Sequence, residues 1–169
     1  MRVAVGADHA GYELKTAIVE ELRRNGFTAV DVGTHNHDPV DYPDLARKVA
    51  EAILNGEADL GIMVCGSGVG ASVAANKFPG IRAATCHDTY SAHQGREHDD
   101  INVLCLGSRV IGSSLAQEIV KTWLAATFSG LPRHRIRLEK IAQIERENCP
   151  GPGNVKTKSS APEPAPSRK

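Results

Sequence analysis

Short apolar runs alternate with longer amphipathic segments along most of the chain. The apolar runs predict β-strands over residues 2–6, 27–32, 59–64, 82–86 and 103–106. Between them, apolar side chains recur at helical spacing, as in the series Leu14, Ile18 and Leu22, which predicts helices that pack one face on a sheet. Because the strand runs are apolar throughout, the sheet is expected to be parallel and covered on both faces. The pattern predicts a three-layer α/β/α sandwich, Rossmann-like, with a five-stranded parallel sheet.

The carboxyl-terminal part of the chain follows a different pattern. A last helix is predicted from about His134 to Glu147, with Pro132 as its start signal. From Cys149 onward, the sequence CPGPGNVKTKSSAPEPAPSRK contains five of the nine prolines and no aromatic residue. Such a segment cannot bury enough apolar surface to offset the entropy lost on ordering. We therefore expect one domain over residues 1–148 and a disordered tail over residues 149–169.

Charge and composition exclude several classes of protein. The 20 Lys and Arg residues balance the 20 Asp and Glu residues, which argues against a nucleic-acid or anionic-membrane partner. No apolar run approaches the roughly 20 residues that span a bilayer, and the amino terminus does not resemble a signal peptide. A cytoplasmic protein is expected. The four cysteines lack the spacing of a zinc site, and Cys86 and Cys105 are expected to be buried and inert.

Polar residues gather where the predicted strands end. Ligands of open α/β sheets bind beyond the carboxyl ends of the strands, so these residues are candidates for a site. His98 and Asp99, which close the helix before the last strand, are expected to join the others at this edge. The residues that follow the five strands are Asp8 and His9, then Gly33 to Tyr42, then Cys65 to Gly70, then His87 and Asp88, and finally Gly107 to Arg109.

The most specific local signal is the sequence CGSGVG at residues 65–70, between a predicted strand and a predicted helix. Its three glycines allow backbone N–H groups to converge on an anion. The same dipoles favour a thiolate at Cys65. The alternative is a glycine-rich turn that carries an inert cysteine, and the local sequence does not decide between the two. Neither a dinucleotide fingerprint nor a phosphate-binding P-loop is present, because the glycine spacing and the required lysine are missing.

Histidines and arginines elsewhere carry weaker signals. His35 and His37 lie in a polar loop, where solvated side chains are favoured over a metal site, and His93 is expected on a helix surface. His9 and His98 are candidates for proton transfer near neutral pH. The arginines of the sequence RHRIR at residues 133–137 form either an exposed basic face or a phosphate clamp, which the forked guanidinium serves well.

Taken together, the motifs resemble the ribose-5-phosphate isomerase type B family, which also includes galactose-6-phosphate isomerase subunits. The matching motifs are spread over residues 2–147, so the resemblance covers essentially the whole predicted domain. They are GADHAGYELK at 6–15, DVGTH and DYPDLA within 31–46, CGSGVGASVAANKFPGIRAA at 65–84, REHDDINVLCLGSRVIG at 96–112, and RHRIR at 133–137.

The resemblance implies an aldose–ketose isomerase of pentose phosphate metabolism that interconverts ribose 5-phosphate and ribulose 5-phosphate without metal or other cofactor. Cys65 would be the base that moves a proton between C2 and C1 through a cis-enediolate. Some members of the family lack this cysteine and use a glutamate further along the loop, but residues 70–73 offer no carboxylate. His98, helped by Ser67, would open the furanose ring. The amides that would stabilise the enediolate belong to Gly66, Ser67, Gly68, Val69 and Gly70.

The resemblance also implies how the substrate is bound. Asp8 and His9 would hold its hydroxyl or phosphate end, and Tyr42 would line the pocket. The site is expected at the interface of a homodimer, or of dimers paired into a tetramer, with the last arginines reaching in from the partner. The arginines that would bind sugar oxygens or phosphate are Arg109, Arg133 and Arg137.

One residue departs from the family pattern. Asp99 stands where asparagine is usual, and a carboxylate cannot donate a hydrogen bond to a sugar oxygen. Asp99 is therefore expected to affect the choice of substrate. Erythrulose 4-phosphate and the 6-phosphates of allose or galactose remain alternative substrates, and a non-catalytic sugar-phosphate-binding module is an alternative of another class.

Overall fold

A computed structural model of the chain describes residues 1–148, in which five parallel strands form one sheet in the order β2-β1-β3-β5-β4. The strands are β1 (Arg2–Ala7), β2 (Thr28–Gly33), β3 (Leu60–Cys65), β4 (Ala83–Thr85) and β5 (Val103–Gly107). The helices are α1 (Tyr12–Arg24), α2 (Tyr42–Leu54), α3 (Val69–Ala75), α4 (Thr89–Asp99), α5 (Ser113–Ala125) and α6 (Pro132–Asn148).

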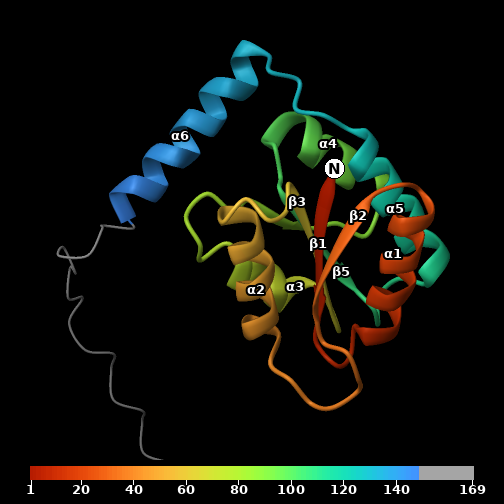
Figure 1. Cartoon of the computed structure of the whole chain (residues 1–169). Coiled ribbons are helices and arrows are strands. Elements are labelled where there is room, and N and C mark those ends of the chain that lie inside the picture. The colour runs from red at the N-terminus through yellow and green to blue at the C-terminus, as the bar shows by residue number, and fades with distance from the viewer. Residues whose placement is uncertain (149–169) are drawn as a thin grey trace, which may run out of the picture.

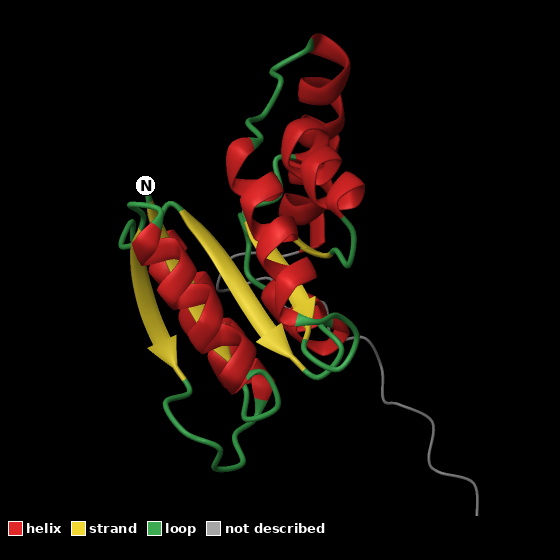
Figure 2. Cartoon of the chain, turned by 90° about the vertical axis from the view of Figure 1, so that its right-hand side faces the viewer, coloured by secondary structure: helices red, strands yellow, loops and turns green. Residues whose placement is uncertain are grey.

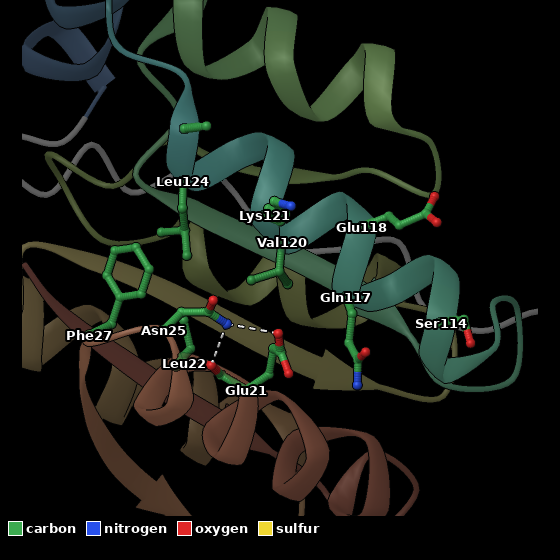
Figure 3. A pocket seen from close by; sticks show the side chains of 11 residues that line it. Glu21, Leu22, Asn25, Phe27, Ser114, Gln117, Glu118, Val120, Lys121 and Leu124 are labelled. Carbon is green, nitrogen blue, oxygen red and sulfur yellow. Dashed lines mark hydrogen bonds between the residues drawn. The ribbon is translucent and has the colours of Figure 1, made fainter.

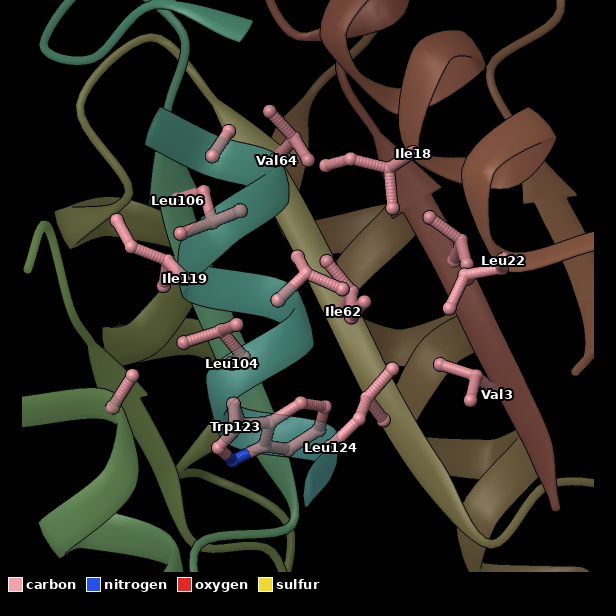
Figure 4. Close-up of a cluster of buried hydrophobic side chains, with 14 of the residues drawn as sticks. Val3, Ile18, Leu22, Ile62, Val64, Leu104, Leu106, Ile119, Trp123 and Leu124 are labelled. Atoms are coloured by element: carbon pink, nitrogen blue, oxygen red, sulfur yellow. The ribbon is translucent and has the colours of Figure 1, made fainter. Parts of the chain in front are cut away.

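Helices cover both faces of the sheet, which makes three layers (Figures 1 and 2). On one face, side chains of α1, α4 and α5 form a buried cluster with the strands. Ile18, Ile119 and the fully buried Trp123 belong to this cluster (Figure 4). On the other face, α2 and α3 pack on the sheet through residues such as Leu45, Val49 and Ala71. The expected α/β/α sandwich with its five-stranded parallel sheet is confirmed.

The predicted strand limits agree with the observed ones to within one or two residues. The three central strands β1, β3 and β5 are largely buried apolar runs, and the edge strands β2 and β4 are half-buried. The last helix begins two residues earlier than predicted, at Pro132. Three apolar side chains of this helix are largely exposed: Ile136, Ile141 and Ile144 are 50%, 45% and 60% exposed. In Figure 1, α6 lies well apart from the sheet. The predicted tail, with Cys149, lies outside the described residues.

A buried lysine joins the first helix to the second strand. Lys15 has a side chain only 2% exposed, and its Nζ lies 2.8 Å from both carboxylate oxygens of Asp31. The same ammonium donates to the carbonyl of Thr34 at 2.8 Å. Since one acceptor belongs to β2 and the other to the loop that follows it, the lysine of α1 fixes where that loop leaves the sheet.

We expect Lys15→Met to destabilise the protein by about 3 kcal/mol, because it leaves the Asp31 carboxylate largely buried without its partner. The matched control is Arg24→Met, which breaks an exposed pair with Glu21 and should cost less than about 0.5 kcal/mol. Urea denaturation measures both changes. Equal losses for the two variants would contradict the role of Lys15.

Candidate active site

Loops at the carboxyl edge of the sheet are tied together by hydrogen bonds. Asp8 N–H donates to the carbonyl of Val64 at 3.2 Å, and the hydroxyl of Ser108 donates to the carbonyl of Ala10 at 2.8 Å. The N–H of Ser108 donates to the carbonyl of Cys65 at 2.9 Å. The loops after β1, β3 and β5 therefore form one rigid platform, as expected where adjacent parallel strands end.

Cys65 is the last residue of β3 and is 4% exposed. Its Sγ accepts a hydrogen bond from the N–H of Gly68 at 3.1 Å, so the glycine loop curls back over the thiol. Gly68 reaches this position with φ +79°, a conformation that strains other residues. Ser67 is exposed, and its Oγ accepts from the N–H of Val69 at 3.3 Å. The backbone of the glycine loop thus donates directly to the thiol.

Two side chains contact the glycine loop, one from the start of α2 and one from the loop after β5. The Tyr42 ring packs so closely on Gly70 that a Cβ there would lie 2.7 Å from it. The Arg109 side chain packs on Gly66. A Cβ added at Gly66 would lie 3.7 Å from the guanidinium carbon of Arg109, which is ordinary van der Waals contact. These contacts bring a cation and a phenol to the loop that carries the thiol.

The two residues after β1 have different environments. Asp8 is buried, and its Oδ1 accepts from the N–H of Gly11 at 3.0 Å. His9 is exposed, and its Nδ1 lies 3.3 Å from both the backbone nitrogen and the carbonyl oxygen of Val40. We refer to Asp8, His9, Tyr42, residues 65–70 and Arg109 as the carboxyl-edge group.

Two supporting residues at this edge were given no role from the sequence, although His87 was named among the residues that follow the strands. His87 Nε2 accepts from the N–H of Gly107 at 3.0 Å, and Thr85 Oγ1 donates to the carbonyl of Gly68 at 3.1 Å. Both hold the backbone on which the glycine loop rests. The position of His87 directly after a predicted strand was the only sequence signal for it.

The expectation that His98 and Asp99 share this edge is wrong within a single chain. Helix α4 starts beyond β4 at the carboxyl edge and runs back, so its last residues lie beside the amino ends of the strands. Eleven residues of α-helix extend about 16 Å, which separates His98 from Cys65. Arg133 and Arg137, in the first turns of α6, lie with His98. We refer to His98, Asp99, Arg133 and Arg137 as the amino-edge group.

Ion pairs fix the end of α4 next to this group. Asp100 has a left-handed backbone with φ 46°. Its carboxylate pairs with Arg96 and lies 2.7 Å from Nη2 of Arg82, at the start of β4. His98 is 28% exposed, with Nε2 3.6 Å from a carboxylate oxygen of Glu97. The turn that presents His98 and Asp99 is therefore anchored to the sheet.

The other two described cysteines are buried, as predicted. Burial, with a smaller contribution from the negative charge of Asp88, raises the pKa of the Cys86 thiol to about 11. Burial also raises the pKa of Cys105. Both thiols thus stay protonated at neutral pH, which leaves Cys65 as the candidate for acid–base chemistry.

The described surface has hollows besides the loop region. One groove of about 510 Å³ lies between α1 and α5, and no residue of either group lines it (Figure 3). A smaller hollow of about 320 Å³ includes Arg109 of the carboxyl-edge group, and a third of about 700 Å³ lies between α6 and residues 76–83 and includes Asp99. Arg109 and Asp99, one residue from each group, therefore line different hollows.

Comparison with known proteins gives the family. Residues 3–141 match the model of the Ribose/Galactose Isomerase family. The chain belongs to this family. The resemblance inferred from the motifs is therefore confirmed. The prediction that the chain is an aldose–ketose isomerase is confirmed as well.

Members of the ribose/galactose isomerase family align with nearly the whole described chain. Ribose-5-phosphate isomerase B of Escherichia coli (strain K12) is 49% identical over 145 residues, which are 86% of this chain and 97% of that protein. D-erythrulose-4-phosphate isomerase of Pectobacterium atrosepticum is 42% identical over 151 residues, 87% of this chain and 97% of that protein. The solved structure of ribose-5-phosphate isomerase B from Clostridium thermocellum superposes with a TM-score of 0.85 at 52% identity, covering 87% and 99% of the two chains.

Two further observations concern possible partners of the described part. Residues 1–148 contain no helix long and apolar enough to cross a membrane. Within the same residues, no three His, Cys, Asp or Glu side chains are grouped so that they could hold a metal ion.

Proposed function

We propose that the protein interconverts ribose 5-phosphate and ribulose 5-phosphate, with Cys65 as the base. The observation that supports this proposal is the hydrogen bond of 3.1 Å from Gly68 N–H to Cys65 Sγ, which joins the thiol to a glycine-rich loop of the kind that binds anions. One base that reaches two adjacent carbons, beside amides that stabilise an enediolate, is what aldose–ketose isomerisation requires.

The reaction follows from these positions. The Cys65 thiolate takes the proton from C2 of the open-chain aldose, and the electron pair forms the enediolate, whose oxygens the loop amides stabilise. The thiol then returns a proton to C1 while the proton on O2 passes to O1, which yields the ketose. His98 with Ser67 moves the proton between the ring oxygen and the C1 hydroxyl when the furanose opens. Arg133 and Arg137 bind the phosphate, where the forked guanidinium donates two hydrogen bonds.

Asp99 makes a four-carbon sugar phosphate the second candidate substrate. Asp99 offers a carboxylate where the family pattern has an amide, and the 42% identical Pectobacterium relative is named a D-erythrulose-4-phosphate isomerase. A four-carbon sugar phosphate that uses the same enediolate chemistry is therefore the alternative substrate for the same residues.

The test compares kcat/KM for ribose 5-phosphate, erythrulose 4-phosphate, allose 6-phosphate and galactose 6-phosphate, each with and without EDTA. We expect ribose 5-phosphate to be preferred and EDTA to have no effect. Preference for another sugar would keep the mechanism and replace the substrate. No turnover of any of the four would contradict the proposal and favour a binding module.

Arg137→Ala should raise KM for ribose 5-phosphate about tenfold, since one charge-assisted pair with the phosphate is lost. The matched control is Arg135→Ala in the same turn of α6, whose Nε donates to the carbonyl of Gly130 instead. Initial-rate kinetics measure both variants. An unchanged KM for Arg137→Ala would remove this residue from the phosphate site.

We further propose that each site is completed by a second copy of the chain. Within one chain, the carboxyl-edge and amino-edge groups lie at opposite edges of the sheet. The exposed Ile136, Ile141 and Ile144 give α6 an apolar surface suited to packing on another subunit. In a twofold dimer, the amino-edge group of each chain would meet the carboxyl-edge group of the other.

This arrangement predicts that two inactive variants restore each other. When Cys65→Ala and His98→Gln chains are co-expressed, half of the dimers contain one chain of each kind. Each mixed dimer has one intact site, so about a quarter of the wild-type activity should return. In the control, Cys65→Ala with Gly68→Ala, both defects lie in the carboxyl-edge group and no activity should return. Failure of the first pair to restore activity would contradict the shared site.

A further inference from the structure

A second histidine lies buried against His98. His134, in the first turn of α6, is 1% exposed, and it is the one buried residue of that helix. The centroids of the two imidazole rings are 4.2 Å apart, and the rings are inclined by 33°. The reaction proposed above makes no use of His134, so its burial at this place needs a separate explanation.

Hydrogen bonds fix the protonation state of His134. Arg133 Nε donates to Nε2 at 3.0 Å, and because a guanidinium always donates, Nε2 must carry a lone pair. Nδ1, 2.6 Å from the hydroxyl oxygen of Ser129, therefore holds the proton and donates it to that oxygen. Both ring nitrogens are engaged, so the ring can neither turn over nor accept another proton without losing a bond.

The segment that carries His134 is joined to the end of α4. The N–H of Ser129 donates to the carbonyl of Glu97 at 2.9 Å, one residue before His98. The carboxylate of Glu97 lies 3.6 Å from Nε2 of His98 on the imidazole edge. The His98 ring thus has a carboxylate at its edge and the His134 ring against its face.

The surroundings keep His134 uncharged. Burial, followed by the nearby His98, Arg133 and Arg137, lowers the pKa of His134, and only the carboxylate of Asp99 acts in the opposite direction. A neutral ring can stay in contact with His98 while His98 gains and loses a proton. A second cation at this position would repel the protonated form.

We propose that His134 is a positioning residue for His98: a buried imidazole, clamped by Ser129 and Arg133, whose face sets the orientation of the His98 ring. The inference rests on the proposed function, in which His98 opens the furanose ring. It goes beyond that proposal, because the proposed reaction assigns His134 no part in binding the substrate or moving a proton.

Two reactions of the same enzyme distinguish a loss of His98 positioning from a general loss of activity. Ribose 5-phosphate is largely a closed furanose and needs ring opening before C2 is deprotonated. Ribulose 5-phosphate cannot close to a furanose, because the hydroxyl that would form the ring carries the phosphate. Exchange of its C1 proton with D₂O therefore needs the Cys65 base without any ring opening.

The test uses His134→Gln, which removes the ring and keeps polar groups. Turnover of ribose 5-phosphate should fall about tenfold, a typical share of a proton-transfer contribution, while C1 exchange of ribulose 5-phosphate, followed by NMR, stays within about twofold of wild type. Ser129→Ala should show the same pattern more weakly, and His98→Gln more strongly. Val120→Ala, a core change on α5, controls for lost stability and should leave both rates unchanged.

Equal losses in the two reactions, or no loss in either, would overturn the role of His134. If the wild-type protein turns over neither sugar, the proposed function has failed. The positioning role is then decided by crystal structures of the wild type and His134→Gln. Displacement of the His98 ring in the variant would support the inference, and an unmoved ring would overturn it.

Discussion

Cys65→Ala should lower kcat for ribose 5-phosphate at least a thousandfold while the protein remains folded. The thiol is hydrogen-bonded to the glycine loop itself, and a missing base is not replaced by the loop amides. The side chain is small, so its loss should cost only about 1 kcal/mol of folding free energy. Initial rates and a thermal melt measure the two quantities.

The matched control for this change is Cys86→Ala, which removes another buried thiol at the end of β4. Its pKa of about 11 keeps that thiol protonated, so activity should remain within about twofold of wild type. If Cys65→Ala kept more than a few per cent of wild-type activity, Cys65 would not be the base.

Gly68→Ala should lower kcat about a hundredfold, since the loop amides would be moved away from the enediolate. Gly68 has φ +79°, and an added Cβ would lie 3.0 Å from the backbone carbon of Leu106 and 3.0 Å from Cγ2 of Thr85. The backbone must shift to relieve this contact. The same shift would break the hydrogen bond from Gly68 to the Cys65 thiol, so the base is disturbed together with the amides.

Gly112→Ala is the control, because Gly112 has φ −77° and no atom lies within 4 Å of its added Cβ. It should leave kcat within about twofold of wild type, since no site amide moves. Steady-state kinetics and a crystal structure of each variant measure the effects. A Gly68→Ala enzyme with wild-type kcat would show that the geometry of this loop does not matter for the reaction.

Most of the fold could be predicted because its signals are local. Strands such as β3 are buried apolar runs, and the glycine loop follows β3 directly, so Cys65 and its neighbours could be placed at a strand end from the sequence alone. Helix α1 was equally clear from Leu14, Ile18 and Leu22, which are all buried. These features depend on spacing along the chain and not on contacts across it.

The features that failed or were missed depend on direction and on distant contacts. His98 was assigned to the wrong edge because a crossover helix runs back to the amino ends of the strands. A residue in its last turn therefore lies at the amino edge of the sheet. His87 was placed at the edge but given no role, because its role depends on one hydrogen bond to Gly107, 20 residues away. The burial of His134 depends on contacts with Ser129 and α4. The spacing of apolar residues within α6 gives no sign of these contacts.

The central claim is that the enzyme moves a proton, and not a hydride, between C2 and C1. The most direct measurement incubates the wild-type protein with ribose 5-phosphate in D₂O containing EDTA and follows deuterium by NMR over many turnovers. We expect ribulose 5-phosphate to form, with deuterium accumulating at its C1 and at C2 of ribose 5-phosphate, because the Cys65 thiol exchanges its proton with solvent. Isomerisation without any deuterium in either sugar would contradict the account.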